Sequence, residues 1–198
     1  MSAPGGSLTI DPMASNEVRI IGGKWKGRKL RFPTSAGLRP TLGRVRGSLF
    51  NWLVADVQGA HCLDLYAGSG ALGLEAMSRG GAEVVLVERD RRVAEALRRN
   101  AAMLGANAQV VVTAAQKFLR TAVGPWQLIF LDPPFESDEL DVVLDLIATR
   151  DLLAPGGCVY VEQRKPSMPV VQTPAGSGWR TLKQSQAGDS QFALLARD

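Results

Sequence analysis

Cysteine and histidine are scarce in this chain of 198 residues, which contains Cys62, Cys158 and a single histidine, His61. So few side chains cannot build a zinc site of cysteine and histidine, and two cysteines do not make a disulfide framework. A lone histidine beside an apolar strand also argues against a histidine-dependent nucleophilic triad. We expect no metal, and we expect both cysteines to be buried free thiols in a reducing, cytoplasmic compartment.

Long apolar runs are also missing. The longest candidates, Val84–Val87 and Leu128–Leu131, are strand-sized, whereas a membrane span needs roughly 20 apolar residues. The first 16 residues are polar and rich in glycine, proline and serine, unlike the charged and then apolar leader of a secreted protein. We therefore expect a disordered tail over residues 1–16 and no membrane association.

Positive charge is concentrated in one segment. Residues 17–60 hold nine lysines or arginines against two acidic residues, a net charge of +7, whereas residues 61–198 hold 14 basic and 16 acidic residues. Such an asymmetry predicts a segment that binds a polyanion, above all nucleic acid, attached to a nearly neutral body. An ordinary solvated face is the alternative. Within this segment we expect short strands at Val18–Ile21 and Lys24–Phe32, and a helix from an N-cap at Thr41 to Val54.

From residue 61 the pattern changes to alternating strands and helices. The expected strands are Cys62–Tyr66, Glu83–Val87, Gln109–Val112, Gln127–Leu131 and Cys158–Glu162. The expected helices are Leu72–Arg79, Arg91–Leu104, Ala115–Ala122 and Glu139–Leu153, and a turn is expected at Pro155-Gly156-Gly157. Continuous apolar strands between helices predict a parallel sheet covered on both faces. Arg180–Gln186 and Gln191–Ala196 are expected to close the sheet edge as an antiparallel pair.

A glycine-rich turn follows the first of these strands. Gly68-x-Gly70-x-x-Gly73 has the spacing of a dinucleotide fingerprint, and Glu88 lies 20 residues beyond Gly68, where an acid can accept both hydroxyls of a ribose. Asp64 would repel a pyrophosphate beside this turn but would attract the ammonium and sulfonium groups of S-adenosylmethionine. A dehydrogenase that uses NAD, and a purely structural cap by Asp64, are the alternatives.

Asp132-Pro133-Pro134-Phe135 follows the strand expected at Gln127–Leu131. It is therefore expected at the carboxyl edge of the sheet, where open α/β sheets bind ligands. The prolines lack N–H donors, so the Asp132 carboxylate and the Pro133 carbonyl remain as acceptors. Two acceptors aimed at the hydrogens of an exocyclic amine favour the pyramidal geometry in which its lone pair attacks a methyl group. Phe135 offers a ring on which a flipped base can stack. The alternative is an ordinary rigid turn.

These motifs resemble the class I S-adenosylmethionine-dependent methyltransferases that modify exocyclic amines. The N-terminal segment and the glycine turn resemble, more narrowly, the RsmD-type 16S ribosomal RNA guanine-N2 methyltransferases. The matching stretches are Arg19–Gly23, Gly27-Arg28, Leu38–Thr41, Arg44–Arg46, Ser48–Asn51 and Leu65–Ala76. The resemblance extends from about Val18 to Glu162 without a large gap.

The resemblance implies a Rossmann-like α/β fold, with a mostly parallel seven-stranded sheet and a C-terminal antiparallel hairpin. Residues 17–57 would form a small basic extension that docks RNA, and residues 58–198 the methyltransferase domain. The enzyme, expected to be monomeric and cytoplasmic, would methylate N2 of the 16S rRNA guanine conventionally numbered 966. Its substrate would be the small ribosomal subunit or an assembly intermediate.

The resemblance also implies site residues. Those for the cofactor are Asp64, Tyr66, Ala67, Gly68, Ser69, Gly70, Glu88, Arg89, Ala115, Gln116 and Asp132. Those that act on the target base are Asp132, Pro133 and Phe135. The cations expected to contact RNA are Arg19, Lys24, Arg28, Arg39, Arg44 and Arg46.

The chain departs from the family at two places. Gly43 and Gly47 stand where relatives usually carry acidic residues, so we expect a weaker helix and no pairing of its arginines with an acid. Ala114 stands where relatives often carry Asp or Asn for the adenine amine, so we expect a backbone group or Gln116 to serve there. Methylation of a DNA base or of a protein glutamine, and a non-catalytic RNA-binding assembly factor, are the remaining alternatives.

Overall fold

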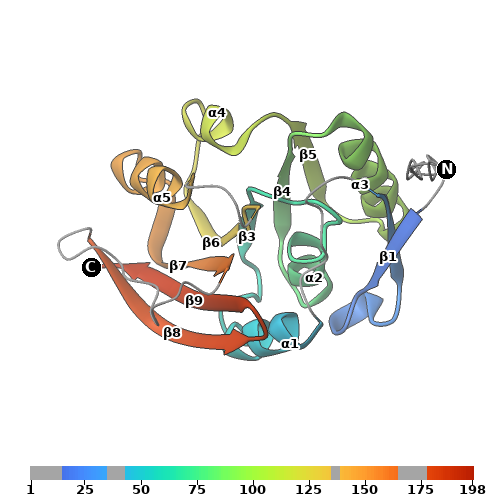
Figure 1. Cartoon of the computed structure of the whole chain (residues 1–198), viewed down its shortest axis with the longest axis horizontal. Helices are drawn as coiled ribbons and strands as arrows, with labels where there is room; N and C mark the ends of the chain where they lie inside the picture. The colour runs from blue at the N-terminus through green and yellow to red at the C-terminus, as the bar shows by residue number, and fades with distance from the viewer. Residues whose placement is uncertain (1–14, 35–42, 135–138, 165–177) are drawn as a thin grey trace, which may run out of the picture.

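A computed structural model describes residues 15–34, 43–134, 139–164 and 178–198. Its centre is a seven-stranded sheet with the order β5-β4-β3-β6-β7-β9-β8 (Figure 1). The bounds are β3 (His61–Asp64), β4 (Glu83–Glu88), β5 (Ala108–Val112), β6 (Trp126–Leu131), β7 (Leu153–Arg164), β8 (Trp179–Ala187) and β9 (Ser190–Arg197). The strands β5, β4, β3, β6 and β7 are parallel, and β9 is antiparallel to both of its neighbours. The predicted parallel sheet with a C-terminal antiparallel hairpin is confirmed.

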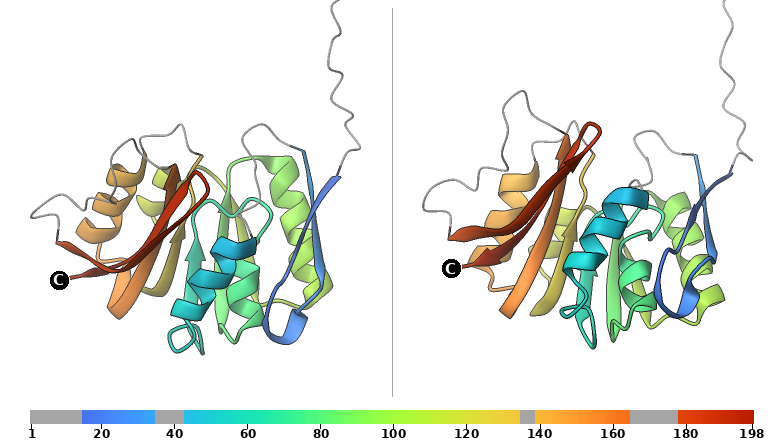
Figure 2. Two further views of the ribbon diagram at one scale, coloured as in Figure 1. Left: turned by 60° about the horizontal axis from the view of Figure 1, so that its bottom comes forward. Right: turned by 90° about the horizontal axis from the view of Figure 1, so that it is seen from below.

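Helices cover both faces of this sheet (Figure 2). Their bounds are α1 (Gly43–Trp52), α2 (Gly73–Ser78), α3 (Arg91–Leu104), α4 (Ala115–Leu119) and α5 (Glu139–Thr149). Alternate residues of each strand point to opposite faces, so Leu128 and Phe130 of β6 pack with α1, α2 and α3, whereas Ile129 and Leu131 pack with α4 and α5. This burial on both sides explains why the strands read as continuous apolar runs.

The boundaries of α3 follow its local sequence. Asp90 caps the helix, since its side chain accepts hydrogen bonds from the backbone N–H groups of Arg92 (2.8 Å) and Val93 (3.2 Å). Gly105 ends the helix in the left-handed conformation, with φ of 61°, as glycine does at many helix C-termini. The predicted helix Arg91–Leu104 is therefore confirmed at both ends.

Two predicted boundaries were wrong in the second half of the chain. The turn expected at Pro155-Gly156-Gly157 lies inside β7, which begins at Leu153. Its pairing with β6 slips there, because Trp126 pairs with Leu153 whereas Leu128 pairs with Cys158. The glycines and the proline thus form an irregularity within the strand. The helix expected to extend to Leu153 accordingly ends at Thr149.

The N-terminal segment forms a small sheet of its own. The strands β1 (Ser15–Arg19) and β2 (Lys29–Pro33) pair antiparallel, with the short 3₁₀ helix η1 (Gly23–Trp25) between them. Ser15 and Asn16 fall within the predicted disordered tail, but they pair with Pro33 and Phe32. The rest of that tail and the N-cap expected at Thr41 lie outside the described residues.

The helix α1 ends at Trp52, two residues before the predicted end at Val54. The backbone N–H groups of Asp56 and Val57 both donate to the Leu53 carbonyl, which turns the chain away from the helix axis. The side chain of Val54 is 71% exposed, so extending the helix to Val54 would gain no stability from burial of this side chain.

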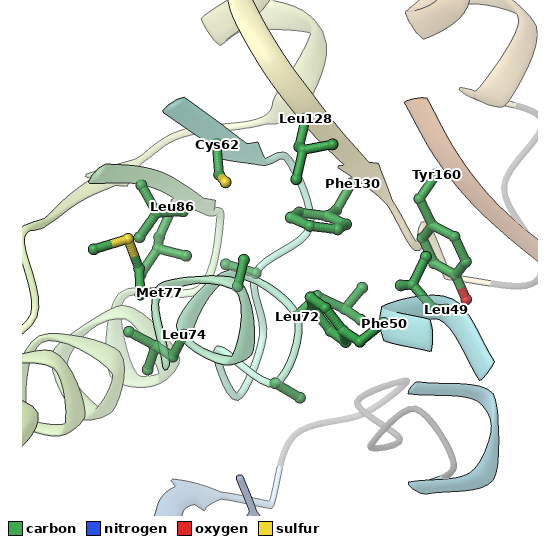
Figure 3. Packing of buried hydrophobic residues seen from close by; sticks show 14 of the residues in the cluster. Leu49, Phe50, Cys62, Leu72, Leu74, Met77, Leu86, Leu128, Phe130 and Tyr160 are labelled. Carbon is green, nitrogen blue, oxygen red and sulfur yellow. The ribbon is translucent and has the colours of Figure 1, made fainter. Parts of the chain in front are cut away.

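The basic segment and the central seven-stranded sheet share one hydrophobic core. Leu49 and Phe50 of α1 are fully buried and point toward Phe130 and Tyr160 (Figure 3). The ring centroids of Phe50 and Phe130 are 6.1 Å apart. The same cluster contains Val18, Ile20, Leu30 and Phe32 from the small sheet.

Cys62 and Cys158 are free and buried, as predicted. Burial raises the pKa of each thiol to about 12, so both are kept protonated and unreactive. Within the described residues, no helix is long and apolar enough to span a membrane. In the same part of the chain, no group of three or more Asp, Glu, His or Cys side chains is arranged to hold a metal ion.

Candidate cofactor and substrate site

Acidic residues stand at or just after the carboxyl ends of four neighbouring parallel strands. Asp64 ends β3, Glu88 ends β4, Asp132 follows β6, and Glu162 lies near the end of β7. In the sheet register, Asp64 lies opposite Leu86 of β4 and Phe130 of β6. Because the ends of parallel strands meet at one edge, these carboxylates gather on the edge where open α/β sheets bind ligands.

The glycine turn lies beside Asp64. Gly68 and Gly70 have φ of 49° and 82°, in the left-handed region that favours glycine. A Cβ on Gly70 would lie 2.6 Å from Cδ1 of Leu97, so another residue here would force this side chain of α3 to move. The Gly70 N–H donates to the Ala67 carbonyl at 2.7 Å, and the Gly73 N–H donates to Oδ2 of Asp64 at 3.0 Å. The predicted turn before α2 is therefore formed, with Asp64 as one of its supports.

Asp64 also has an oxygen that the fold leaves unused. Its side chain is buried, and Oδ1 has no hydrogen-bond partner among the described residues. Burial raises the pKa of Asp64 to about 7, opposed by the backbone N–H groups of Gly73 and Tyr66 and assisted by the nearby charge of Glu88. A buried carboxylate oxygen without a partner costs free energy that a cationic ligand group would recover. A cationic group such as the ammonium group expected from the sequence would be a suitable partner for this oxygen.

Glu88 ties the glycine turn to the start of α3. Its Oε2 accepts from the Gly68 N–H at 3.0 Å, and its Oε1 accepts from the Asp90 N–H at 2.8 Å. A carboxylate has about four lone-pair sites, so these two bonds leave room for the two hydroxyls of a ribose. The adjacent Arg89 is exposed. The half-buried Glu88 therefore has both the position and the acceptor capacity that its predicted role needs.

The remaining predicted cofactor residues lie within this turn, next to it or at the same sheet edge. Ala67 and Ser69 are buried within it. Tyr66 donates from its hydroxyl to Oε2 of Glu139 at 2.9 Å, which joins the turn to the start of α5. Ala115 is buried and Gln116 is half-buried in the first turn of α4, which follows β5 at the same sheet edge.

The proline motif lies at the end of β6. Asp132 and Pro134 are half-buried and Pro133 is buried, whereas Phe135 lies outside the described residues. Burial raises the pKa of Tyr160 on β7, and the nearby charges of Glu162 and Asp132 raise it further, so Asp132 lies near this phenol. The structure thus brings Asp132 to the same edge as Asp64 and Glu88.

Glu162 was not among the site residues predicted from the sequence. It is buried beside the proline motif, accepts from the Tyr160 hydroxyl at 2.8 Å and is hydrogen-bonded to Ser190. Burial raises its pKa despite these bonds. A sequence signal does exist, because Glu162 directly follows the apolar run Cys158–Val161, as Asp64 and Glu88 follow apolar runs.

Glu75 was also missed, although it is the one acidic residue of the otherwise mostly apolar helix α2. Its side chain is fully buried and accepts from the backbone N–H groups of Ile21 and Gly22, each at 2.8 Å, and from Nε of Arg79 at 2.7 Å. Nearby, the Ser78 hydroxyl accepts from the Trp25 N–H at 2.9 Å. The helix α2, which follows the glycine turn, therefore holds the loop of the basic segment directly.

Arg46 is not the surface cation that we expected. Its side chain is 3% exposed, its Nη2 donates to the Arg19 carbonyl at 3.0 Å, and its Nη1 lies 3.6 Å from Oε2 of Glu75. The expectation that no acid pairs with the α1 arginines is therefore wrong, because the acid comes from α2. Burial lowers the pKa of Arg46. This position removes Arg46 from the cations that we propose for RNA contact.

The other predicted RNA-binding cations lie on the surface where the structure describes them. Arg19, Lys24, Arg28 and Arg44 are exposed, and Nζ of Lys24 lies 4.3 Å from the ring centroid of Trp25. Arg39 lies outside the described residues.

The strand order, the glycine turn and the acidic strand ends define a class I S-adenosylmethionine-dependent methyltransferase. Residues 18–196 match the family model described as Conserved hypothetical protein 95. The chain belongs to this family, that of the RsmD-type methyltransferases.

Curated relatives support the same family. Ribosomal RNA small subunit methyltransferase D of Escherichia coli is 44% identical over 93% of this chain and 92% of its own length. The protein of the same name from Haemophilus influenzae is 38% identical over 92% and 95%. A solved Escherichia coli methyltransferase superposes with a TM-score of 0.82 and 40% identity, covering 92% of this chain and 99% of that one. A methyltransferase complexed with SAH, at 14% identity and a TM-score of 0.65, shares the fold.

Proposed function

We propose that this protein transfers a methyl group from S-adenosylmethionine to the exocyclic N2 of a guanine in 16S rRNA, the guanine conventionally numbered 966. The observation that carries the proposal is the position of Asp132-Pro133-Pro134, which lies at the same sheet edge as the glycine turn. An acceptor for an amine thus stands next to a site suited to a methyl donor. The names of the curated relatives support ribosomal RNA of the small subunit as the substrate.

The cofactor would be held by residues of three strand ends. The unpartnered oxygen of Asp64 suits its ammonium group, Glu88 suits its ribose, and the start of α4 at Ala115 and Gln116 suits its adenine. Ala114 offers no side-chain cap, so recognition of the adenine amine falls to the backbone or to Gln116. When bound, S-adenosylmethionine supplies an electrophilic methyl group on a sulfonium.

The target base would be oriented by the proline motif. The N2 amine of guanine is a poor nucleophile because its lone pair is delocalised into the ring. The Asp132 carboxylate and the Pro133 carbonyl would accept its two hydrogens and so free the lone pair for attack. The Asp132 carboxylate would hold the amine proton that is released as the new N–C bond forms. Phe135 would stack on the base, which must leave its helix to reach this edge.

Transfer of a labelled methyl group tests the proposal. Small ribosomal subunits, and 16S rRNA stripped of protein, would be prepared from cells that lack this enzyme and incubated with labelled S-adenosylmethionine. Nucleoside analysis is expected to show N2-methylguanosine at one position, with the subunit or its assembly intermediate as the preferred substrate. Another labelled nucleoside would overturn the assignment of N2. Label in protein glutamine or in DNA, but not in rRNA, would overturn the proposed substrate.

A further inference from the structure

A groove of about 960 Å³ lies between the β1–β2 hairpin and α3, away from the glycine turn. Figure 2 shows the hairpin lying along this helix. The positively charged side chains that line the groove are Arg19, Arg28, Lys29, Arg31, Arg92 and Arg99. Glu95 is the acidic residue among the lining residues. The lining is therefore net positive, with four cations on the hairpin wall and two arginines against one glutamate on the α3 wall.

One wall is a single face of α3. Arg92, Glu95 and Arg99 are three and four residues apart, so they project from the same side of the helix. At a rise of about 1.5 Å per residue, Arg92 and Arg99 are roughly 10 Å apart along the helix axis. Neither arginine belongs to the basic N-terminal segment, so charge counting along the sequence did not reveal them.

The other wall is fixed by the hairpin. Arg19 and Lys29 lie directly opposite each other in the antiparallel pair. The backbone of Arg31 is held to α3 by Asn100, which accepts from its N–H at 3.2 Å and donates to its carbonyl at 3.0 Å. Phe32 is buried below. Both walls are thus rigid, and the groove is preformed.

Most cations of the groove form no ion pair among the described residues, although the charge of Glu17 lies near those of Arg19 and Arg31. Lys29 pairs with Glu17 at 2.8 Å, but the five arginines of the groove form no salt bridge within the residues that the structure describes. These arginines are exposed. The like charges on the facing walls repel each other, which costs electrostatic free energy. A polyanion bound between the walls would offset this repulsion. A concave groove suits a chain of phosphates better than it suits a flat bilayer surface.

The groove also leads to the candidate site. The helix α3 begins three residues after Glu88, so Arg92 lies at the end of the groove nearest the cofactor edge. Asn100 and Met103 lie toward the far end. A chain of phosphates in the groove would run along α3 toward the edge that carries Asp64, Glu88 and Asp132.

We propose that this groove binds the phosphate backbone of the RNA that flanks the target base. Arg92 and Arg99 of α3 would contact phosphates from one wall of the groove. The inference rests on the proposed RNA substrate. It adds a second RNA-binding wall, formed by α3, to the cations of the N-terminal segment.

Two double variants test the groove. Arg92→Gln/Arg99→Gln removes the two arginines that line it, and Arg91→Gln/Arg98→Gln removes two exposed arginines of the same helix that do not. The net charge changes equally in both. Binding to small ribosomal subunits from cells lacking the enzyme would be measured across a salt series. Removal of one phosphate-binding cation lowers the salt slope by about 0.7 to 0.9. We expect the slope of the groove variant to be smaller by roughly 1.4 to 1.8, because two such cations are removed, and its binding to be at least about tenfold weaker near 0.1 M salt.

The control variant is expected to keep the wild-type slope. Both variants should retain the wild-type affinity for S-adenosylhomocysteine and the wild-type unfolding midpoint. These two results would show that the fold is intact in each variant. Equal losses of binding in both variants, or no loss in either, would overturn the proposal that RNA binds in the groove. Methylation of rRNA by the wild type would still support the proposed function in that case. If the wild type neither binds nor methylates rRNA, both proposals fail. Tighter binding of poly-glutamate than of RNA, with the same dependence on Arg92 and Arg99, would replace RNA by an acidic protein partner.

Discussion

At the scale of single residues, the two oxygens of Asp64 lie in different surroundings. Oδ2 supports the glycine turn through Gly73, and Oδ1 is buried without a partner among the described residues. Burial raises the pKa of Asp64 from its ordinary 3.8 to about 7. The neutral form is therefore favoured in the folded protein, and the stability that this group contributes at low pH is lost as the pH rises from about 4 to about 7.

Ligand affinity should show the opposite trend. An ammonium group binds the ionised carboxylate, so affinity for S-adenosylhomocysteine is expected to increase as the pH rises through about 7, with release of a proton on binding below that pH. Calorimetry from slightly acidic to slightly alkaline pH measures both. Asp64→Asn, which keeps an acceptor for the Gly73 N–H, should bind more weakly and lose this pH dependence. A wild-type affinity that is flat over this range would contradict the contact.

Asp132 is predicted to border both the cofactor and the base, and we expect its main role to be on the base. Asp132→Asn should lower the methylation rate by about 10²–10³, the usual cost of one preorganised charged contact. Its affinity for S-adenosylhomocysteine should fall only modestly. The two readouts are single-turnover methyl transfer and calorimetry. Loss of cofactor binding in parallel with activity would place Asp132 in the cofactor site instead.

Some site residues were predictable and others were not. Asp64, Glu88 and Asp132 follow strands at recognisable turns, so their edge position could be read from the sequence. Glu75 could not be placed, because its partners Ile21, Gly22 and Arg46 lie at least 29 residues away along the chain. Arg46 was misread for the same reason. A cation in a basic segment is usually solvated, and only the tertiary structure brings it to a buried acid.

At the scale of elements, α2 connects the glycine turn with the N-terminal segment. Glu75→Gln would leave Arg46 buried without an opposite charge, and breaking a buried ion pair in this way typically costs about 3–5 kcal/mol. We expect the free energy of unfolding to fall by that order in urea titrations. Arg79→Gln is the matched comparison, and it should cost less because the Arg79 side chain is 20% exposed. Equal stability of Glu75→Gln and wild type would show that the cluster contributes little.

Element boundaries were predictable where a local signal sets them. The cap at Asp90 and the left-handed Gly105 are such signals, and α3 matched at both ends. The glycines at 156 and 157 gave the same kind of signal but a different structure, because pairing with β6 slips at them and resumes at Cys158, so that β7 continues past them. Local turn residues do not report whether a neighbouring strand continues to pair.

At the scale of the whole molecule, charge and packing divide the chain differently. Residues 17–57 differ in charge from the rest, yet Leu49 and Phe50 are completely buried against the central sheet. A chain that begins at residue 58 would expose the apolar surface of Phe130 and Tyr160 that these side chains cover. We expect it to lack a cooperative thermal transition, since losing one large core side chain already costs about 2–5 kcal/mol. Cooperative unfolding of that shortened chain would show that residues 58–198 fold on their own.

The outermost strand, β8, has a consequence for the behaviour of the protein at high concentration. Within the described residues it pairs on one side only, with β9, and its side chains from Arg180 to Gln186 are exposed. Its pairing slips between Thr181 and Lys183. A regular open edge offers unpaired N–H and carbonyl groups to a strand from another molecule, but charged side chains and backbone irregularities oppose such pairing. The β8 edge is therefore protected against edge-to-edge aggregation, and a substitution of Lys183 by a β-branched apolar residue would weaken that protection.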